Sequence, residues 1–163
     1  SVGAVTKQFF PRLGKPDTLV TAGHICVEFI ELLPQARPLL DKFYKLQRSR
    51  MRSVGNARWW VARDSEIIAG ANFMPISGGH WLTGLHVAIE HRNKGYGRGL
   101  LNGAQASLGG PVWLFCAPEL HEYYRRAGFE EAVTLPSELA QRLERYRASK
   151  DLLTLVRAEA ATA

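Results

Sequence analysis

The segment LHVAIEHRNKGYGRGLL, residues 85–101, decides the fold of this chain. It begins in an apolar, β-branched segment, 80–89, that is typical of a strand, and it ends in residues 95–108, whose apolar positions recur at helical spacing. Glycines and a proline at 109–111 end that helix, and residues 112–116, VWLFC, form a continuous apolar run typical of a strand buried on both faces. These three elements predict a β-α-β unit with parallel strands and a right-handed crossover.

Upstream of this unit, the sequence predicts antiparallel strands. Residues 58–63 and 66–74 have strand patterns, and short turns join them to each other and to the strand at 80–89. Short connections between successive strands are typical of hairpins. A first strand over 24–33 and an amphipathic helix around 39–46 precede them.

Downstream of residue 116, we expect a helix that starts at Pro118, a strand within 129–135, a helix over 138–148 capped by Ser137, and a last strand over 152–156. The fold class is therefore α/β (α+β). It is a single domain over 23–163 with a mixed, mostly antiparallel sheet of about six to seven strands flanked by helices. Residues 1–22 show no clear period and are interpreted as an N-terminal arm.

The composition of the 163 residues is that of a soluble globular protein, with 46% hydrophobic and 22% charged residues. No apolar run is long enough to span a bilayer, and no secretory signal is visible, so we expect no membrane partner. Cys26 and Cys116 form neither a disulfide framework nor a metal pattern. We expect a cytoplasmic chain without a metal.

The net charge of +6 is concentrated in two places. Seven basic residues lie between Arg37 and Arg58 against one acid, Asp41, and a second basic cluster lies among the glycines near residue 95. An uneven basic balance favours an anionic partner, which could be a phosphorylated cofactor, nucleic acid or an acidic surface. For the first cluster, the solvated face of a helix is the favoured interpretation.

The glycine-rich stretch 92–99 lies between a predicted strand and a predicted helix, where unpaired backbone N–H groups favour a phosphate. Gly95 and Gly97 would let the backbone approach the anion closely. A Walker A loop is excluded because Gly-Lys-Ser/Thr is missing, and in a dinucleotide motif the third glycine would come one residue later than Gly99. The remaining alternatives are an R-x-x-G-x-G coenzyme A loop and a turn without a ligand.

Two segments together resemble the GNAT superfamily of acetyl-CoA-dependent N-acetyltransferases. They are residues 85–101 and YYRRAGF, residues 123–129, with an apolar strand between them. The resemblance covers residues 58–129 closely and the rest by the order of elements. It implies a GNAT-like fold with acetyl-CoA as cosubstrate and no metal. The implied reaction is acetyl transfer to a primary amine, of a small molecule or a protein, by direct attack in a ternary complex.

The resemblance also implies roles for particular residues. Leu85 and Val87 would pair their backbone with the pantetheine arm, and an N–H near Val87 would polarise the thioester carbonyl. Tyr124, four residues before Gly128, matches the general acid of the family, whereas Tyr123 is interpreted as a packing residue. The residues implied to cradle the pyrophosphate are Arg92, Asn93, Lys94, Gly95, Tyr96, Gly97 and Arg98.

The general base is the least determined role. The positions where some members carry a Glu or His correspond to Trp81 and Thr83, which cannot serve. His86 is our candidate, although strict alternation directs His80 and His86 to the other face of the sheet unless Gly84 marks a bulge. Further options lie on the helix near residue 120, at Glu119 and His121.

The acceptor site of the family is built from segments that correspond to 34–57 and 130–150. We expect basic walls there, with aromatic surface from Trp59, Trp60 and Trp81, and an acceptor amine that carries a carboxylate or phosphate, or an acidic protein. The alternative functions are an acetyltransferase that acts on aminoacyl-tRNA and a non-catalytic acyl-CoA-binding regulatory module. Nucleic acid is not expected as a partner, and a homodimer is left open.

Overall fold

The computed structural model describes residues 26–159, so the predicted N-terminal arm, 1–22, lies outside the described residues. The strands are β1 (Glu28–Glu31), β2 (Arg58–Arg63), β3 (Ile67–Ile76), β4 (Gly79–Val87), β5 (Val112–Cys116), β6 (Glu130–Glu131) and β7 (Leu153–Arg157). The helices are α1 (Arg37–Leu46), α2 (Tyr96–Leu108), α3 (His121–Arg126) and α4 (Ser137–Arg147), with short 3₁₀ turns at Pro34–Ala36, Ile89–His91 and Pro118–Leu120.

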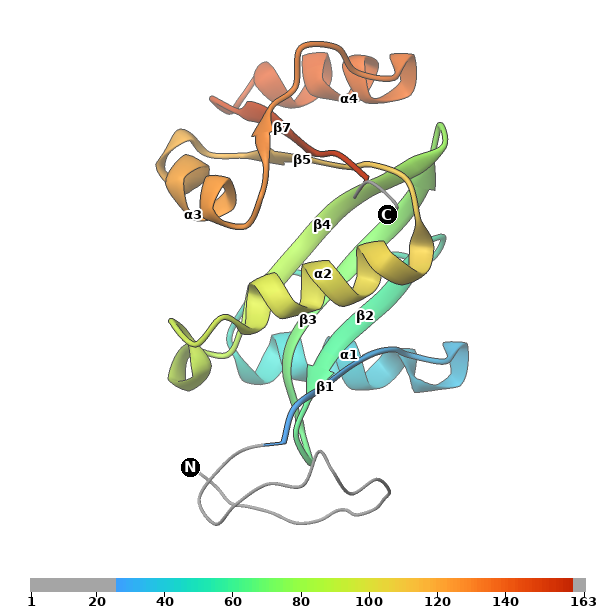
Figure 1. Ribbon diagram of the computed structural model, residues 1–163, viewed down its shortest axis with the longest axis vertical. Coiled ribbons are helices and arrows are strands. Elements are labelled where there is room, and N and C mark those ends of the chain that lie inside the picture. Colours follow the sequence, from blue (N-terminus) through green and yellow to red (C-terminus); the bar gives the residue numbers. More distant parts are fainter. Residues whose placement is uncertain (1–25, 160–163) are drawn as a thin grey trace.

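The strands form one sheet in the order β1-β2-β3-β4-β5-β7-β6. Every neighbouring pair is antiparallel except β4 and β5, which are parallel and joined by α2 (Figure 1). The predicted mixed, mostly antiparallel sheet with a β-α-β unit is therefore confirmed. The β-α-β unit places the start of α2 beside the end of β4. The candidate site is built around this junction.

The two faces of the sheet are covered by different helices. On one face, α2 and the end of α3 pack on a core that includes Phe73, Leu82 and Leu114. On the other face, α1 packs against Trp59 and Val61, while Leu139 of α4 packs on neighbouring strands. The central strands alternate apolar residues between the two faces, as Trp60 and Val61 of β2 do, which explains why their sequences are apolar nearly throughout.

A β-bulge interrupts β4 at Gly84. Thr83 pairs with Asn72 and His86 pairs with Gly70, so two residues of β4 lie opposite the single residue between Asn72 and Gly70. Gly84 has φ +66°, and a Cβ there would lie 2.8 Å from the Asn72 amide and 2.9 Å from the Tyr44 hydroxyl, so a glycine is required.

The bulge reverses the alternation of side chains along β4. Leu82 and then Leu85 pack into the α2 face, whereas His86 contacts α1. The expectation from strict alternation was therefore wrong for His86, which shares its face with Trp81. The physical reason is the one extra residue that the bulge inserts into β4. From the sequence, a bulge at Gly84 is the condition under which His86 changes faces.

Strands β4 and β5 pair only at His80↔Val112 and Trp81↔Trp113, although β4 continues to Val87. Beyond these two pairs, β5 pairs only with β7 on its other side. Figure 1 shows the two strands diverging from the end near the β3–β4 turn. Among residues 26–159, one edge of the second half of β4 therefore has no strand partner.

Some boundaries differ from the sequence predictions. β1 has four residues and β6 only two, and the chain has left the sheet before α4 begins at Ser137. Pro136 rather than Ser137 is the N-cap of α4, and no side-chain cap hydrogen bond forms there. Edge strands depend on tertiary pairing more than on local pattern, which explains the misplaced limits of both.

Candidate active site

The unpaired edge of β4 presents the backbone of Val87. The N–H of Ala88 donates to Ile68 O of β3 at 2.8 Å. Since successive backbone groups point to opposite edges of a strand, the Val87 N–H and C=O are directed toward β5. The Val87 carbonyl accepts a 2.9 Å hydrogen bond from Arg92 Nε, so Arg92 folds back onto the edge that Leu85 and Val87 line.

The glycine-rich loop leads from this edge into α2. Gly95 is the N-cap of α2 with φ +83°, no side chain caps the helix, and the space at the Gly95 Cβ position is open. The first helical bond runs from Gly99 N–H to Gly95 O at 2.9 Å, so the N–H groups of residues 96–98 have no helical acceptor. Lys94 and Arg98 are exposed beside them. The loop therefore offers donors and positive charge to an anion.

Other members of the loop have packing roles that the sequence did not reveal. Tyr96 packs on the core and its ring lies 6.1 Å from that of His91, while Asn93 takes a left-handed conformation with φ 65°. A Cβ on Gly99 would lie 2.5 Å from the Phe29 ring, so Gly99 lets α2 approach β1.

Gly97 is buried beneath Tyr123. A Cβ on Gly97 would collide with the Tyr123 hydroxyl and approach Val87 at 3.4 Å. Burial raises the pKa of Tyr123, although the charge of Arg92 opposes the shift. Tyr123 is thus more than a packing residue, because its hydroxyl reaches the loop predicted to bind pyrophosphate.

Tyr124 lies on the α3 side of the sheet, against the same core as α2. Its ring packs 5.0 Å from Tyr123 and 5.5 Å from Phe129. Burial raises the pKa of its hydroxyl, with smaller contributions from Tyr123 and from Cys116 at the end of β5. The hydroxyl therefore stays protonated at neutral pH, which a hydrogen-bond donor or general acid requires.

His86 lies on the opposite face, near α1. Its Nε2 is 3.4 Å from the Gln47 amide oxygen, and its ring packs edge-on against Phe43 at 5.8 Å. Burial and then the charge of Arg92 lower the pKa of His86. The imidazole is therefore neutral near pH 7, as a base must be. His80 is buried on the α2 face and does not join this group.

Trp81 fills the position where a base was sought. It packs 5.4 Å from Phe115 and 6.2 Å from Tyr146, and the Arg142 guanidinium lies 4.9 Å from its ring centroid. Trp81 is buried, as are Trp59 and Trp60. The expectation that these three tryptophans provide exposed aromatic surface is wrong, because α1, α2 and α4 cover them.

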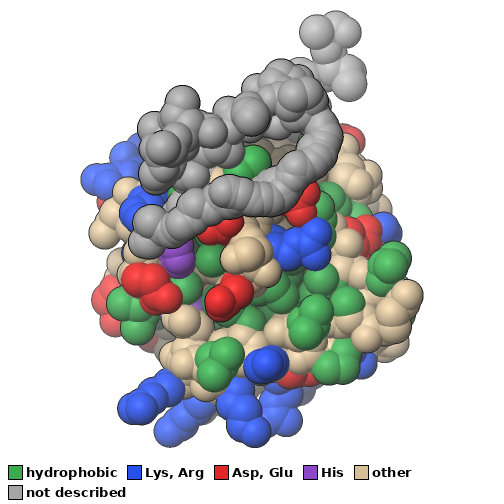
Figure 2. Space-filling view, turned by 90° about the horizontal axis from the view of Figure 1, so that it is seen from below, with side chains coloured by type: hydrophobic (Ala, Val, Ile, Leu, Met, Phe, Trp, Pro, Cys, Tyr) green, Lys and Arg blue, Asp and Glu red, His purple; other side chains and the backbone are tan. Residues whose placement is uncertain are grey.

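Hydrogen bonds of the Asn72 side chain, on β3, hold the basic segment 34–57 beside β4. The Asn72 amide nitrogen donates to Arg52 O at 3.1 Å and to Thr83 O at 3.5 Å, and its oxygen accepts Val54 N–H at 2.8 Å. The exposed cations of this segment are Lys42, Lys45, Arg48, Arg50 and Arg52. Figure 2 shows Lys and Arg side chains gathered along the lower edge of the molecule.

The other expected wall, 130–150, is not basic. It holds four acidic and four basic residues, and its helix α4 covers Trp81. Only the wall formed by 34–57 carries excess positive charge, so the prediction of two basic walls is corrected to one.

Arg157 of β7 is a candidate contact that sequence reasoning missed. A Cβ on Gly128 would lie 3.0 Å from Arg157 Nε, and the guanidinium donates to Asn102 of α2. Burial and then the charge of Arg98 lower the pKa of Arg157. Two guanidinium groups thus lie near each other at the first turns of α2. No sequence signal links residues so far apart.

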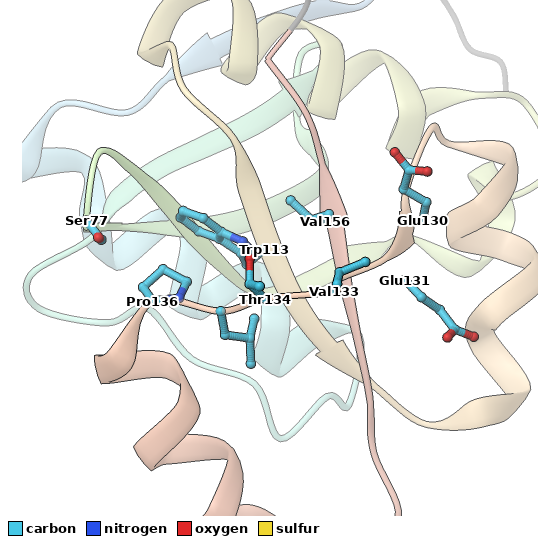
Figure 3. Close-up of a pocket in the computed structure, with 9 residues that line it drawn as sticks. Ser77, Trp113, Glu130, Glu131, Val133, Thr134, Pro136 and Val156 are labelled. Carbon is cyan, nitrogen blue, oxygen red and sulfur yellow. The ribbon is translucent and has the colours of Figure 1, made fainter.

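A separate pocket of about 560 Å³ lies between the outer strands and the segment before α4. Figure 3 shows Ser77 at one end of the pocket, Trp113 in the middle, and Glu130 and Glu131 at the other end. None of the predicted catalytic or cofactor-binding residues lines it, whereas the start of the expected acceptor segment 130–150 does. Its lining residues are Ser77, Trp113, Glu130, Glu131, Val133, Thr134, Leu135, Pro136 and Val156.

Within residues 26–159, no cluster of His, Cys, Asp or Glu could hold a metal ion. No helix in the same range is long and apolar enough to cross a membrane.

Comparison with known proteins identifies the family. Residues 55–131, which contain the divergent strands, the glycine-rich loop and both tyrosines, match the model of the acetyltransferase (GNAT) domain. Residues 55–131 therefore form a GNAT acetyltransferase domain. A search of the curated proteins returned no match.

Solved structures share the fold of this GNAT domain. A putative GNAT-family acetyltransferase from Desulfovibrio desulfuricans is 19% identical with a TM-score of 0.58, over 82% of this chain and 99% of that chain. N-acetylglutamate synthase from Neisseria gonorrhoeae, complexed with coenzyme A and L-arginine, is 17% identical with a TM-score of 0.61, over 83% of this chain and 34% of that chain. The ribosomal-protein-S18-alanine N-acetyltransferase from Escherichia coli is 13% identical with a TM-score of 0.56, over 84% and 96%.

Proposed function

We propose that this GNAT domain is an N-acetyltransferase that moves the acetyl group of acetyl-CoA to a primary amine by direct attack in a ternary complex. The observation that carries the proposal is the separation of β4 from β5 after two residue pairs, with the unpaired Val87 backbone and the uncapped start of α2 at its end. An extended pantetheine arm can add to such an edge as a strand would, and a pyrophosphate suits the helix start.

The residues present fit this cosubstrate. Lys94 and Arg98 are exposed where the pyrophosphate would lie, and the open space at Gly95 admits an anion close to the backbone. In the free protein, Arg92 donates a hydrogen bond to the Val87 carbonyl, and the Tyr123 hydroxyl lies over Gly97. Both side chains would move when the cosubstrate binds, which frees Arg92 to contact phosphate.

The acid and the base act from opposite faces of the sheet. His86, on the α1 side, accepts the proton that the acceptor ammonium must lose before its nitrogen attacks the thioester carbon. The Val87 N–H stabilises the negative charge that develops on the carbonyl oxygen. Tyr124, on the α3 side, donates its proton to the sulfur as the carbon–sulfur bond breaks. The products are the acetylated amine and free coenzyme A thiol.

The acceptor approaches over the face of β4 that carries Thr83 and His86. The cations beside this face, Arg50 and Arg52 among them, favour an amine that also bears a carboxylate or phosphate, or an amine on an acidic protein. Aminoacyl-tRNA would be held by the same cations, and its acetylation would then depend steeply on salt concentration.

One observation favours a second candidate, a non-catalytic acyl-CoA-binding module. Trp81 occupies a position where some family members carry a catalytic base, and it is buried under α4. The two candidates are separated by incubating the full chain with acetyl-CoA and a panel of amines, then measuring free thiol and the masses of the products. An enzyme releases thiol in step with one acetylated amine. Binding of acetyl-CoA without turnover on any amine would instead support the regulatory module.

A further inference from the structure

Gln47, the C-cap residue of α1, makes two contacts through one atom. Its amide oxygen accepts the Ile89 N–H at 3.1 Å and lies 3.4 Å from His86 Nε2. Phe43, one turn earlier in α1, packs against the edge of the same imidazole. The end of α1 therefore holds both the second half of β4 and the start of the turn that leads to the glycine-rich loop.

The two contacts fix the protonation pattern of the ring. A backbone N–H can only donate, so the Gln47 group that faces Ile89 is the oxygen and not the amide nitrogen. The same oxygen can only accept, so its contact with His86 requires a proton on Nε2. A neutral imidazole carries a proton on one nitrogen, which leaves the lone pair on Nδ1.

We propose that Gln47 is a positioning residue that holds His86 as the Nε2–H tautomer, so that Nδ1 is the atom that accepts the proton of the acceptor amine. This inference rests on the proposed function for its purpose. The tautomer itself rests only on the geometry of Gln47, His86 and Ile89.

The surroundings of His86 are consistent with a neutral ring. Phe43 of α1 and Gly70 of β3 carry no titratable group, and Arg92 of the glycine-rich loop is the charged group whose influence reaches the imidazole. Like charge and burial both disfavour the imidazolium form. The Gln47 contact then decides which nitrogen carries the single proton.

The tautomer is tested by NMR of ¹⁵N-labelled full-length protein without substrate. The ring nitrogens of His86, assigned by loss of their signals in His86→Ala, should show a protonated Nε2 and an unprotonated Nδ1. Gln47→Leu should give a mixture of tautomers, and the matched control Gln141→Leu, on the exposed side of α4, should not. A protonated Nδ1 in the wild type, or an unchanged ring in Gln47→Leu, would overturn the proposal.

The purpose of the contact is tested by Gln47→Glu, which places a carboxylate beside Nε2. An opposite charge at this distance should raise the pKa of His86 by about one to three units. The acidic limb of the pH profile of kcat/KM should move up with it, and Gln141→Glu should leave the limb in place. If NMR shows a raised pKa of His86 in Gln47→Glu but the acidic limb of kcat/KM stays at the same pH, His86 is not the general base. Absence of any acetyl transfer would count against the proposed function, because the NMR arm needs no turnover.

Discussion

The Tyr44 hydroxyl donates a 2.5 Å hydrogen bond to the carbonyl oxygen of Gly84, at the centre of the β4 bulge. This bond joins α1 to the one position where β4 changes its alternation. Tyr44 is 1% exposed and Gly84 is partly buried, so the bond lies largely away from solvent. The orientation of His86 toward α1 therefore depends on a contact between a helix residue and a glycine carbonyl.

Tyr44→Phe should lower the free energy of unfolding by about 1–2 kcal/mol, because the partly buried Gly84 carbonyl loses its donor. Urea unfolding followed by circular dichroism measures the change. Tyr146→Phe is the control, since Tyr146 is partly exposed and its ring contacts do not involve the hydroxyl. Equal stability of Tyr44→Phe and wild type would contradict the role of this bond.

Gly97→Ala and Tyr123→Phe separate the packing role of Gly97 from its ligand role. In wild type, the added Cβ collides with the Tyr123 hydroxyl, so Gly97→Ala should destabilise the fold. In Tyr123→Phe the colliding atom is gone and the next ring atom is 3.6 Å away, so Gly97→Ala should cost less stability there.

Acetyl-CoA binding by the same double variant tests the ligand role. If the pyrophosphate lies against Gly97, binding should stay weakened in Gly97→Ala/Tyr123→Phe although folding recovers. Unfolding midpoints and dissociation constants for the four proteins provide both readouts. Binding that recovers together with stability would show that Gly97 is needed only for packing.

Tyr124→Phe removes one hydroxyl and keeps the ring that packs on Phe129. If Tyr124 protonates the leaving thiolate, kcat should fall by about 10²–10⁴ while acetyl-CoA affinity changes little. Because the pKa of Tyr124 is raised, the acid stays protonated and active through neutral pH, and activity that depends on it declines only at strongly alkaline pH. Steady-state kinetics at saturating substrates, with Tyr146→Phe as control, decide the point, and an unchanged kcat with rate-limiting chemistry would exclude the role.

Arg50→Glu and Arg52→Glu test the basic wall. Each should raise KM for an anionic acceptor by about two- to fivefold, the range of an exposed charge contact, and the effect should shrink in high salt. The dissociation constant for acetyl-CoA should stay unchanged. Arg145→Glu, an exposed residue of α4, is the control. An equal rise in KM for Arg145→Glu would indicate a general charge effect.

Local pattern predicted the central elements well. β2 and β5 have the predicted limits, and α2 begins one residue from its predicted start, because apolar period and glycine or proline signals fix such elements. The limits of β6 were misplaced, because they depend on where an edge strand stops pairing, and the N-cap of α4 is Pro136 rather than the predicted Ser137. The bulge at Gly84 was predicted only as a condition, since a glycine in a strand permits a bulge without requiring one.

The site divides in the same way. The loop 92–98 and the edge of β4 could be predicted because their residues are consecutive. The contacts of Gln47 with His86, of Tyr123 with Gly97 and of Arg157 with α2 join distant segments, and nothing in the local sequence indicates them. Even the side of the sheet on which His86 lies depends on one inserted residue.

The central claim, that the edge of β4 beyond its pairing with β5 binds an acyl-CoA, is tested most directly by isothermal titration calorimetry of acetyl-CoA into the full chain. We expect saturable binding of one molecule per chain, which weakens in Gly97→Ala/Tyr123→Phe, and no saturable binding of NAD. Acetyl-CoA at a hundred times its dissociation constant should then add about 2.7 kcal/mol to the stability. The absence of a binding isotherm at millimolar acetyl-CoA, with the protein shown to be folded, would contradict the account.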